Sequence, residues 1–122
     1  MKGRIPNFQN RCFLFIYLLK GDKKMLESKF QSLVIKEVKD RFPGCVVLKN
    51  DPNYIQGFPD LLVLFNNRWA ALEVKADEAS STQPNQAYYI DLLGTMSYAR
   101  FINPTNKRDV IGDLELYFYP NS

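Results

Sequence analysis

Residues 57–75 read GFPDLLVLFNNRWAALEVK and contain the clearest structural signal in the chain. Five consecutive apolar residues, Leu61 to Phe65, are followed by Asn66-Asn67 and then by four more apolar residues, Trp69 to Leu72. Short apolar runs bounded by turn residues are typical of buried strands, and a two-residue turn between them indicates a hairpin. The stretch therefore predicts a β-hairpin whose two strands are buried on both faces.

Ionisable side chains stand at one end of this hairpin. Asp60 precedes the first run, and Glu73 and Lys75 close the second. Side chains alternate along a strand, so Glu73 and Lys75 point the same way, and pairing across the turn brings Asp60 near Glu73. Two close carboxylates repel unless a cation neutralises them, and Mg²⁺ uses one or two carboxylates with waters and phosphate. The same spacing also suits an ordinary Glu–Lys pair with Asp60 as a turn residue.

The motif resembles that of a known superfamily. Pro59-Asp60 followed by Glu73-Val74-Lys75 is similar to the PD…(D/E)xK signature of restriction-endonuclease-like nucleases. The closer resemblance is to the VRR-NUC branch, since GFPD, the apolar strand and EVK are followed by Ser-x-x-x-x-Gln from Ser81 to Gln86. Glu27, in an upstream helix, also fits the branch. The resemblance covers the chain from Met25 to about Ile102.

The resemblance implies an α/β fold, with a central mixed sheet flanked by helices in the order αβββαβ. It implies that Asp60, Glu73 and the backbone carbonyl of Val74 bind Mg²⁺ or Mn²⁺, which would activate a water. Glu27 would join them directly or through water, although an acid in a first helical turn also suits the helix dipole. Lys75 would orient the water and offset charge in the transition state.

Contacts to substrate are implied for a further set of residues: Lys49, Tyr54, Gly57, Gln86 and Tyr89. Loop polarity explains Lys49 and Tyr54 equally well, and an amide in a first helical turn, as at Gln86, is unremarkable. Gly57 and Pro59 shape the turn before Asp60, because glycine permits close backbone approach and proline fixes its own φ.

The implied activity is metal-dependent hydrolysis of DNA by an endonuclease selective for branched DNA, either Holliday-junction-like or flap. Small stand-alone members of the branch are often virus- or phage-encoded and act as homodimers, which implies a homodimer here. The expected location is the cytoplasm, that of the host cell if the protein is virus-encoded. The alternative function is a nuclease-fold module that binds DNA or a protein partner without cutting. Intact Asp60, Glu73 and Lys75 argue against that alternative.

Composition narrows the chemistry. The 122 residues contain no histidine, which excludes histidine acid–base chemistry and histidine-ligated zinc within this sequence. The two cysteines, Cys12 and Cys45, form no metal or redox motif, so a reducing cytoplasm is the expected compartment.

No glycine-rich phosphate loop is present in the sequence, and we expect neither a small-molecule cofactor nor a membrane partner. The net charge is +3, but residues 25–122 carry ten basic and twelve acidic side chains, so bulk charge does not argue for DNA binding.

The first 24 residues differ from the rest of the chain. Cys12 to Leu19 is an apolar run between basic residues, too short to span a bilayer as a helix. Three interpretations stay open: an additional packed element, a membrane-proximal segment, or sequence upstream of a start at Met25. We therefore assign residues 1–24 to an N-terminal extension and residues 25–122 to a nuclease-like domain.

Periodicity and turn signals predict the remaining elements. They are a helix over 26–42, a strand over 45–48, a helix over 84–93, a strand over 98–102, a short helix within the ambiguous 105–113, and a final strand over 114–119.

Overall fold

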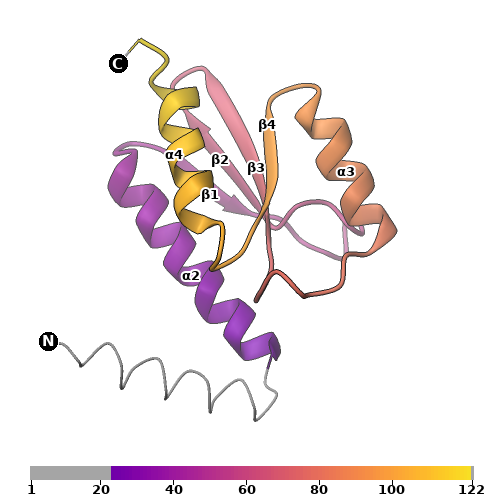
Figure 1. Cartoon of the computed structure of the whole chain (residues 1–122). Coiled ribbons are helices and arrows are strands. Elements are labelled where there is room, and N and C mark those ends of the chain that lie inside the picture. Colours follow the sequence, from indigo (N-terminus) through magenta and orange to yellow (C-terminus); the bar gives the residue numbers. More distant parts are fainter. Residues whose placement is uncertain (1–22, 122) are drawn as a thin grey trace, which may run out of the picture.

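A computed structural model describes residues 23–121 of the 122-residue chain. Seven elements follow one another in these residues (Figure 1): α2 (Lys23–Arg41), β1 (Val46–Lys49), β2 (Leu61–Phe65), β3 (Arg68–Val74), α3 (Pro84–Gly94), β4 (Tyr98–Ile102) and α4 (Lys107–Phe118). The predicted order αβββαβ is confirmed, and α4 follows it. The expected extension, residues 1–24, lies outside the described residues except for the first two positions of α2.

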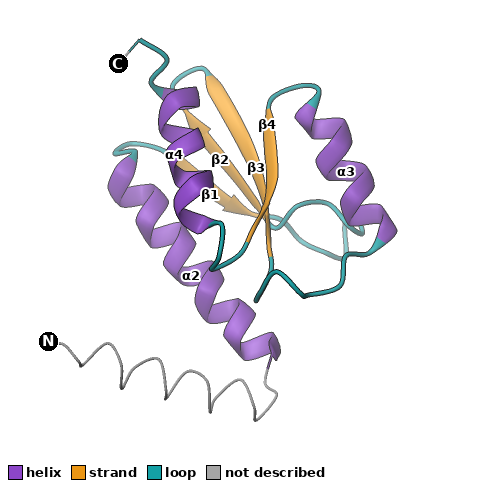
Figure 2. Cartoon of the chain, viewed as in Figure 1, coloured by secondary structure: helices purple, strands orange, loops and turns teal. Residues whose placement is uncertain are grey.

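The four strands form one mixed sheet in the order β1-β2-β3-β4 (Figure 2). β1 and β2 are antiparallel, as are β2 and β3, whereas β4 runs parallel to β3. The predicted hairpin closes at Asn66, whose φ of 56° lies in the left-handed region that asparagine tolerates better than most residues. The hairpin and the mixed sheet are thus both as expected.

Helices cover the two faces of the sheet unequally (Figure 1). α2 and α4 lie together on one face, and α3 lies on the other, against β3 and β4. The main core forms under α2 and α4, where alternate strand residues meet the apolar stripes of both helices. Its largest members with less than 2% exposure are Phe42, Leu61, Leu72, Ile102, Ile111 and Leu114.

The expectation that both strands of the hairpin are buried on both faces holds for β3 and is wrong for β2. In β3 every residue from Ala70 to Val74 is buried, because α2 and α4 cover one face and α3 the other. In β2 the side chains of Leu62 and Leu64 lie on the sheet face opposite to the main core. α3 packs on this face over β3 and β4 and leaves Leu64 37% exposed. A continuous apolar run did not distinguish these two environments.

The C-terminal prediction is also wrong. Residues 107–118 form one helix, not a short helix followed by a strand. Val110, Ile111, Leu114 and Phe118 are buried, and their spacing is that of one helical face. The aromatic run at Tyr117 to Tyr119 suggested a strand because aromatic side chains favour strands, but packing of the helical stripe on the sheet decides the outcome.

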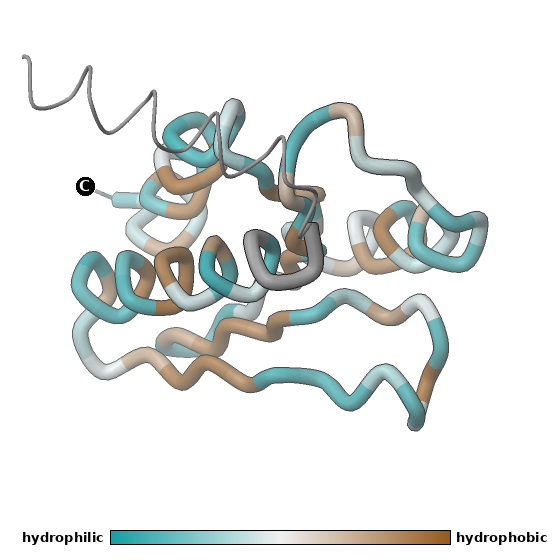
Figure 3. The backbone as a smooth tube through the Cα atoms, turned by 90° about the horizontal axis from the view of Figure 1, so that it is seen from below, coloured by the Kyte–Doolittle hydropathy of each residue, from teal (hydrophilic) through white to brown (hydrophobic). Residues whose placement is uncertain are grey.

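The other predicted boundaries are close to those observed. The strand over 98–102 is confirmed, β1 is displaced by one residue from the expected 45–48, and α2 begins three residues before the expected position 26. The loop between β1 and β2 is largely hydrophilic, whereas the strands beside it are hydrophobic (Figure 3). Within residues 23–121, no helix combines the length and apolarity needed to cross a membrane.

Candidate active site

The register of the hairpin brings Asp60 and Glu73 together. Leu61 pairs with Leu72, so the preceding Asp60 stands opposite Glu73 at the open end of the hairpin. The Asp60 backbone N–H donates a hydrogen bond to Glu73 Oε1 at 3.2 Å, and the Val74 N–H donates one to Asp60 Oδ2 at 2.9 Å. The Glu73 carboxyl group is therefore held by the Asp60 backbone, and the Asp60 carboxyl group by the backbone of Val74, the residue after Glu73.

Glu73 is the charged side chain that the fold buries. It is 3% exposed, the one buried charged or polar side chain among the described residues. Alternation along β3 sends Val74 into the main core and Glu73 to the opposite face, beneath α3. A buried carboxylate is costly unless partners compensate it, so its contacts identify the site.

Lys75 and Gln86 supply those contacts. Gln86 Nε2 donates to Glu73 Oε2 at 2.8 Å, while Gln86 Oε1 accepts from Lys75 Nζ at 2.7 Å. Lys75 Nζ lies 4.0 Å from Glu73 Oε2 and also donates to the Ser81 carbonyl at 3.0 Å. The amide thus joins the acid to the base, and the Lys75 side chain is only 11% exposed. The predicted common orientation of Glu73 and Lys75 is confirmed.

α3 positions Gln86 through its own first turn. Pro84 begins the helix, where its fixed φ and missing N–H cost nothing. Gln86 Oε1 accepts a second hydrogen bond, from the Gln83 backbone N–H at 3.0 Å, so this amide also caps the helix. The helix start and the site therefore share one side chain.

Glu27 approaches the same group from α2. It lines a pocket of about 340 Å³ with Lys75, Gln86 and the 80–83 segment. α2 begins at Lys23 and has no acid in its first turn, so the dipole interpretation of Glu27 is wrong. The pKa of Glu27 is raised by burial and then by the charge of Asp60, while Lys75 and the Ala76 backbone oppose the shift.

All three carboxyl groups have raised pKa values. Burial raises the pKa of Asp60, against the opposing effects of the Val74 N–H and Lys75. Burial, followed by the charge of Asp60, raises the pKa of Glu73 to about 8. Lys75 alone does not compensate three acids, so the site attracts additional positive charge.

The donor set fits a hard divalent cation that needs few protein ligands. Asp60 and Glu73 stand opposite each other across the hairpin with electrostatically coupled carboxyl groups, and carboxylate oxygens are what Mg²⁺ accepts while it keeps several waters. Residues 23–121 contain no group of three or more His, Cys, Asp or Glu side chains able to hold a metal together. Glu27 therefore lies near the site without forming a three-carboxylate cluster, and Asp60 and Glu73 are the residues that suit a divalent cation.

The other predicted substrate contacts differ in position. Lys49 pairs with the core-facing Leu61, so it lies toward the sheet face opposite to Glu73. Gly57 packs against Asn85 at the start of α3, beside the site. Tyr89 stacks edge-on against Phe58, with ring centroids 5.4 Å apart, one turn beyond Gln86. Tyr54 is 85% exposed in the loop after β1.

Sequence reasoning missed two contributors to the site. Asn50 donates from its side chain to the Pro59 carbonyl at 2.6 Å and from its backbone to the Asp60 carbonyl at 2.8 Å, which holds the turn before Asp60. The Phe101 ring lies 5.9 Å from Lys75 Nζ. A polar residue directly after a strand was a usable signal for Asn50, but Phe101 becomes visible only when β4 pairs beside β3.

This arrangement of sheet, α3 and buried Glu73 has a counterpart among solved structures. A VRR_NUC domain protein superposes with a TM-score of 0.57 over 76% of this chain and 88% of its own length, at 19% sequence identity. The chain has the fold of a VRR_NUC domain. Comparisons with protein-family models and with curated protein sequences give no match. The VRR_NUC fold confirms the fold class expected from the sequence, and the identity is too low to carry more than the fold.

Proposed function

We propose that this protein is a metal-dependent DNA endonuclease that acts on branched DNA. The proposal rests mainly on the burial of Glu73. This side chain is only 3% exposed, it accepts hydrogen bonds from Gln86 and the Asp60 backbone, and it faces Lys75. A purely structural hairpin has no reason to bury an acid of pKa about 8 beside a second acid. The VRR_NUC fold of the chain supports the same reaction class.

Each residue has a distinct part in the proposed hydrolysis. Asp60 and Glu73 would hold Mg²⁺ or Mn²⁺, with the Val74 carbonyl as a further ligand. When bound, the ion supplies an acidified water and stabilises charge on the phosphate. Lys75 would contact a phosphate oxygen or orient the water, since its ammonium group is already directed toward the carboxylates.

Gln86 and Glu27 have positioning roles in this proposal. Gln86 keeps Lys75 and Glu73 in a fixed relation through two short hydrogen bonds. Glu27 adds negative charge at the rim, which would favour the cation and a water between them. A homodimer would present two such sites to two strands, which suits a four-way junction or a flap.

Cleavage of labelled DNA tests the proposal. Four-way junction, 5′-flap, single-stranded and duplex DNA are incubated with Mg²⁺ or Mn²⁺, with EDTA as the blank. We expect branched DNA to be cut fastest, and Lys75→Ala to lose at least about a hundredfold in rate, as removal of a transition-state donor does. Lys36→Ala is the matched control, because Lys36 is 76% exposed and pairs with Asp40 on α2.

Metal binding is measured separately by thermal melting. Mn²⁺ should raise the melting temperature of the wild type, since a ligand bound only by the folded state stabilises it, and Asp60→Ala should abolish the rise. Binding of DNA without cutting would favour the non-catalytic module. Equal cutting by Lys75→Ala and wild type would contradict the proposed mechanism.

A further inference from the structure

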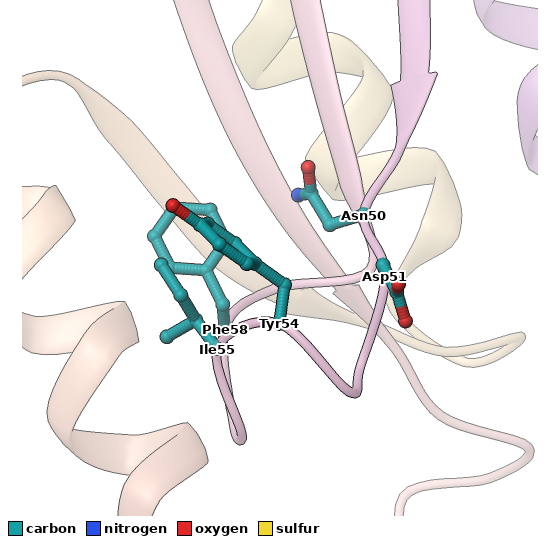
Figure 4. A pocket seen from close by; sticks show the side chains of 5 residues that line it. All are labelled: Asn50, Asp51, Tyr54, Ile55 and Phe58. Carbon is teal, nitrogen blue, oxygen red and sulfur yellow. The ribbon is translucent and has the colours of Figure 1, made fainter.

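A second pocket opens in the loop between β1 and β2, the segment that leads into Asp60. It has a volume of about 420 Å³ and is lined by Asn50, Asp51, Tyr54, Ile55 and Phe58. In Figure 4 the side chains of Tyr54, Ile55 and Phe58 lie close together, and Asn50 and Asp51 stand where the chain leaves β1. A volume of this size is in the range of small-ligand sites, with an aromatic wall and a few polar groups.

Core packing does not account for Tyr54. Its side chain is 85% exposed and makes no hydrogen bond or ring contact with another residue of the described chain. Phe58, by contrast, is fixed by its edge-on contact with Tyr89, which contacts Tyr88 in turn at 5.1 Å. One immobilised ring and one free ring at a pocket wall suit a planar ligand that stacks on them.

The pocket belongs to the same chain segment as the carboxylates. Phe58 precedes Asp60 by two residues, and Asn50 hydrogen-bonds to the Pro59 and Asp60 carbonyls. Tyr89 stands one helical turn beyond Gln86, on the helix that holds Lys75 in place. The pocket and the carboxylate site are therefore connected through the turn before Asp60 and, by the contact of Phe58 with Tyr89, through α3.

The polar rim selects a base over a phosphate. Asp51 places a negative charge there, which repels phosphate, and its Oδ1 already accepts from the Asn53 N–H. The Asn50 amide is oriented by its donation to Pro59, so Oδ1 is left as an acceptor. Cytosine, adenine and guanine carry amino donors, and in a duplex their pairing edges are occupied by the partner strand.

We infer that this pocket, with Tyr54 as its stacking residue, receives an unpaired base next to the scissile phosphate. The inference rests on the proposed nuclease function and narrows it. The substrate carries an unpaired nucleotide at the cut, as a flap does, and a fully paired four-way junction is the poorer substrate.

Binding in EDTA tests the inference without relying on cleavage. Fluorescence anisotropy compares a short single strand with a blunt duplex of the same sequence. Base stacking on an aromatic side chain contributes roughly 1–3 kcal/mol, so Tyr54→Ala should weaken single-strand binding about five- to hundredfold and leave duplex binding unchanged. Tyr54→Phe should retain the affinity. Leu33→Ala, a substitution at a 59% exposed position on α2, is the matched control.

A strand with one abasic position provides the second arm. The abasic site is moved along the strand one nucleotide at a time. At the position whose base occupies the pocket, it should weaken binding by the wild type and leave the affinity of Tyr54→Ala unchanged. Equal single-strand affinity of Tyr54→Ala and wild type, or an equal loss on duplex, would overturn the inference. If no substrate is cleaved but single-strand binding still depends on Tyr54, the proposed nuclease function is refuted and the assignment of the pocket to an unpaired base is retained.

Discussion

Gly57 is the position where one added methyl group should disturb both the fold and the site. Its φ is +87°, and a Cβ there would overlap Asn85 Cβ and lie 2.9 Å from the Asn85 carbonyl carbon. A left-handed conformation costs an L-residue roughly 1–2 kcal/mol, and overpacking adds about 1–3 kcal/mol. We expect Gly57→Ala to lower the free energy of unfolding by about 2–5 kcal/mol.

Gly44 provides the matched comparison. Its φ is +92°, yet no atom lies within 4 Å of a Cβ placed there. Gly44→Ala should therefore show only the backbone cost of roughly 1–2 kcal/mol. Urea unfolding followed by circular dichroism measures both variants, with the slope checked to be unchanged.

The functional consequence separates the two glycines further. Asn85 directly precedes Gln86, so relief of the overlap at Gly57 moves the start of α3 away from Glu73 and Lys75. Gly57→Ala should reduce the Mn²⁺-induced rise in melting temperature and the cleavage rate, whereas Gly44→Ala should change neither. Equal destabilisation of the two variants, within about 0.5 kcal/mol, would refute the packing argument at Asn85.

Two further predictions concern the buried charges. In metal-free protein the pKa of Glu73, about 8, lies above its ordinary 4.5, so the folded state holds the extra proton and the free energy of unfolding falls as pH rises between these values. Glu73 should lower the free energy of unfolding by on the order of 3 kcal/mol between pH 5 and pH 8, and Glu73→Gln should remove this pH-dependent contribution. Urea titrations in EDTA measure both proteins, and an identical pH slope would contradict the raised pKa of Glu73. Gln86→Ala leaves Glu73 and Lys75 without their shared amide and should destabilise the protein by roughly 2–4 kcal/mol, since the hydrogen bond to the charged Lys75 contributes about 1.5–3 kcal/mol and the bond to protonated Glu73 about 0.5–1.5 kcal/mol. The exposed Gln56→Ala is its control and should stay within about 0.5 kcal/mol of wild type by the same urea assay; equal stability of the two variants would show that the amide bridge is not stabilising.

Local pattern was sufficient for the hairpin and for its carboxylates. The two apolar runs and the Asn66-Asn67 turn predict the pairing, and pairing alone brings Asp60 to Glu73. Strand alternation likewise predicts that Glu73 and Lys75 share a face. These conclusions hold because sheet pairing and side-chain alternation are short-range rules that need no knowledge of the rest of the chain.

Local pattern failed where coverage by distant elements decides the environment. Leu62 and Leu64 read as buried because they are apolar, yet α3 covers only β3 and β4. The C-terminal aromatic run favours a strand, yet the stripe from Val110 to Phe118 packs as α4. In both cases the free energy of burial against elements far apart in sequence outweighs the local signal.

The order αβββαβ, the hairpin and the pairing of Asp60 with Glu73 follow from the amino-acid sequence alone. Three features depend on how distant elements pack: Gln86 joins Lys75 to Glu73, Phe101 lies beside Lys75, and burial raises the pKa of Glu73 to about 8. They depend on packing because desolvation and side-chain contact are set by the elements that cover a residue. That coverage is set by the parallel pairing of β4 with β3 and by the packing of α3 on one face of these two strands.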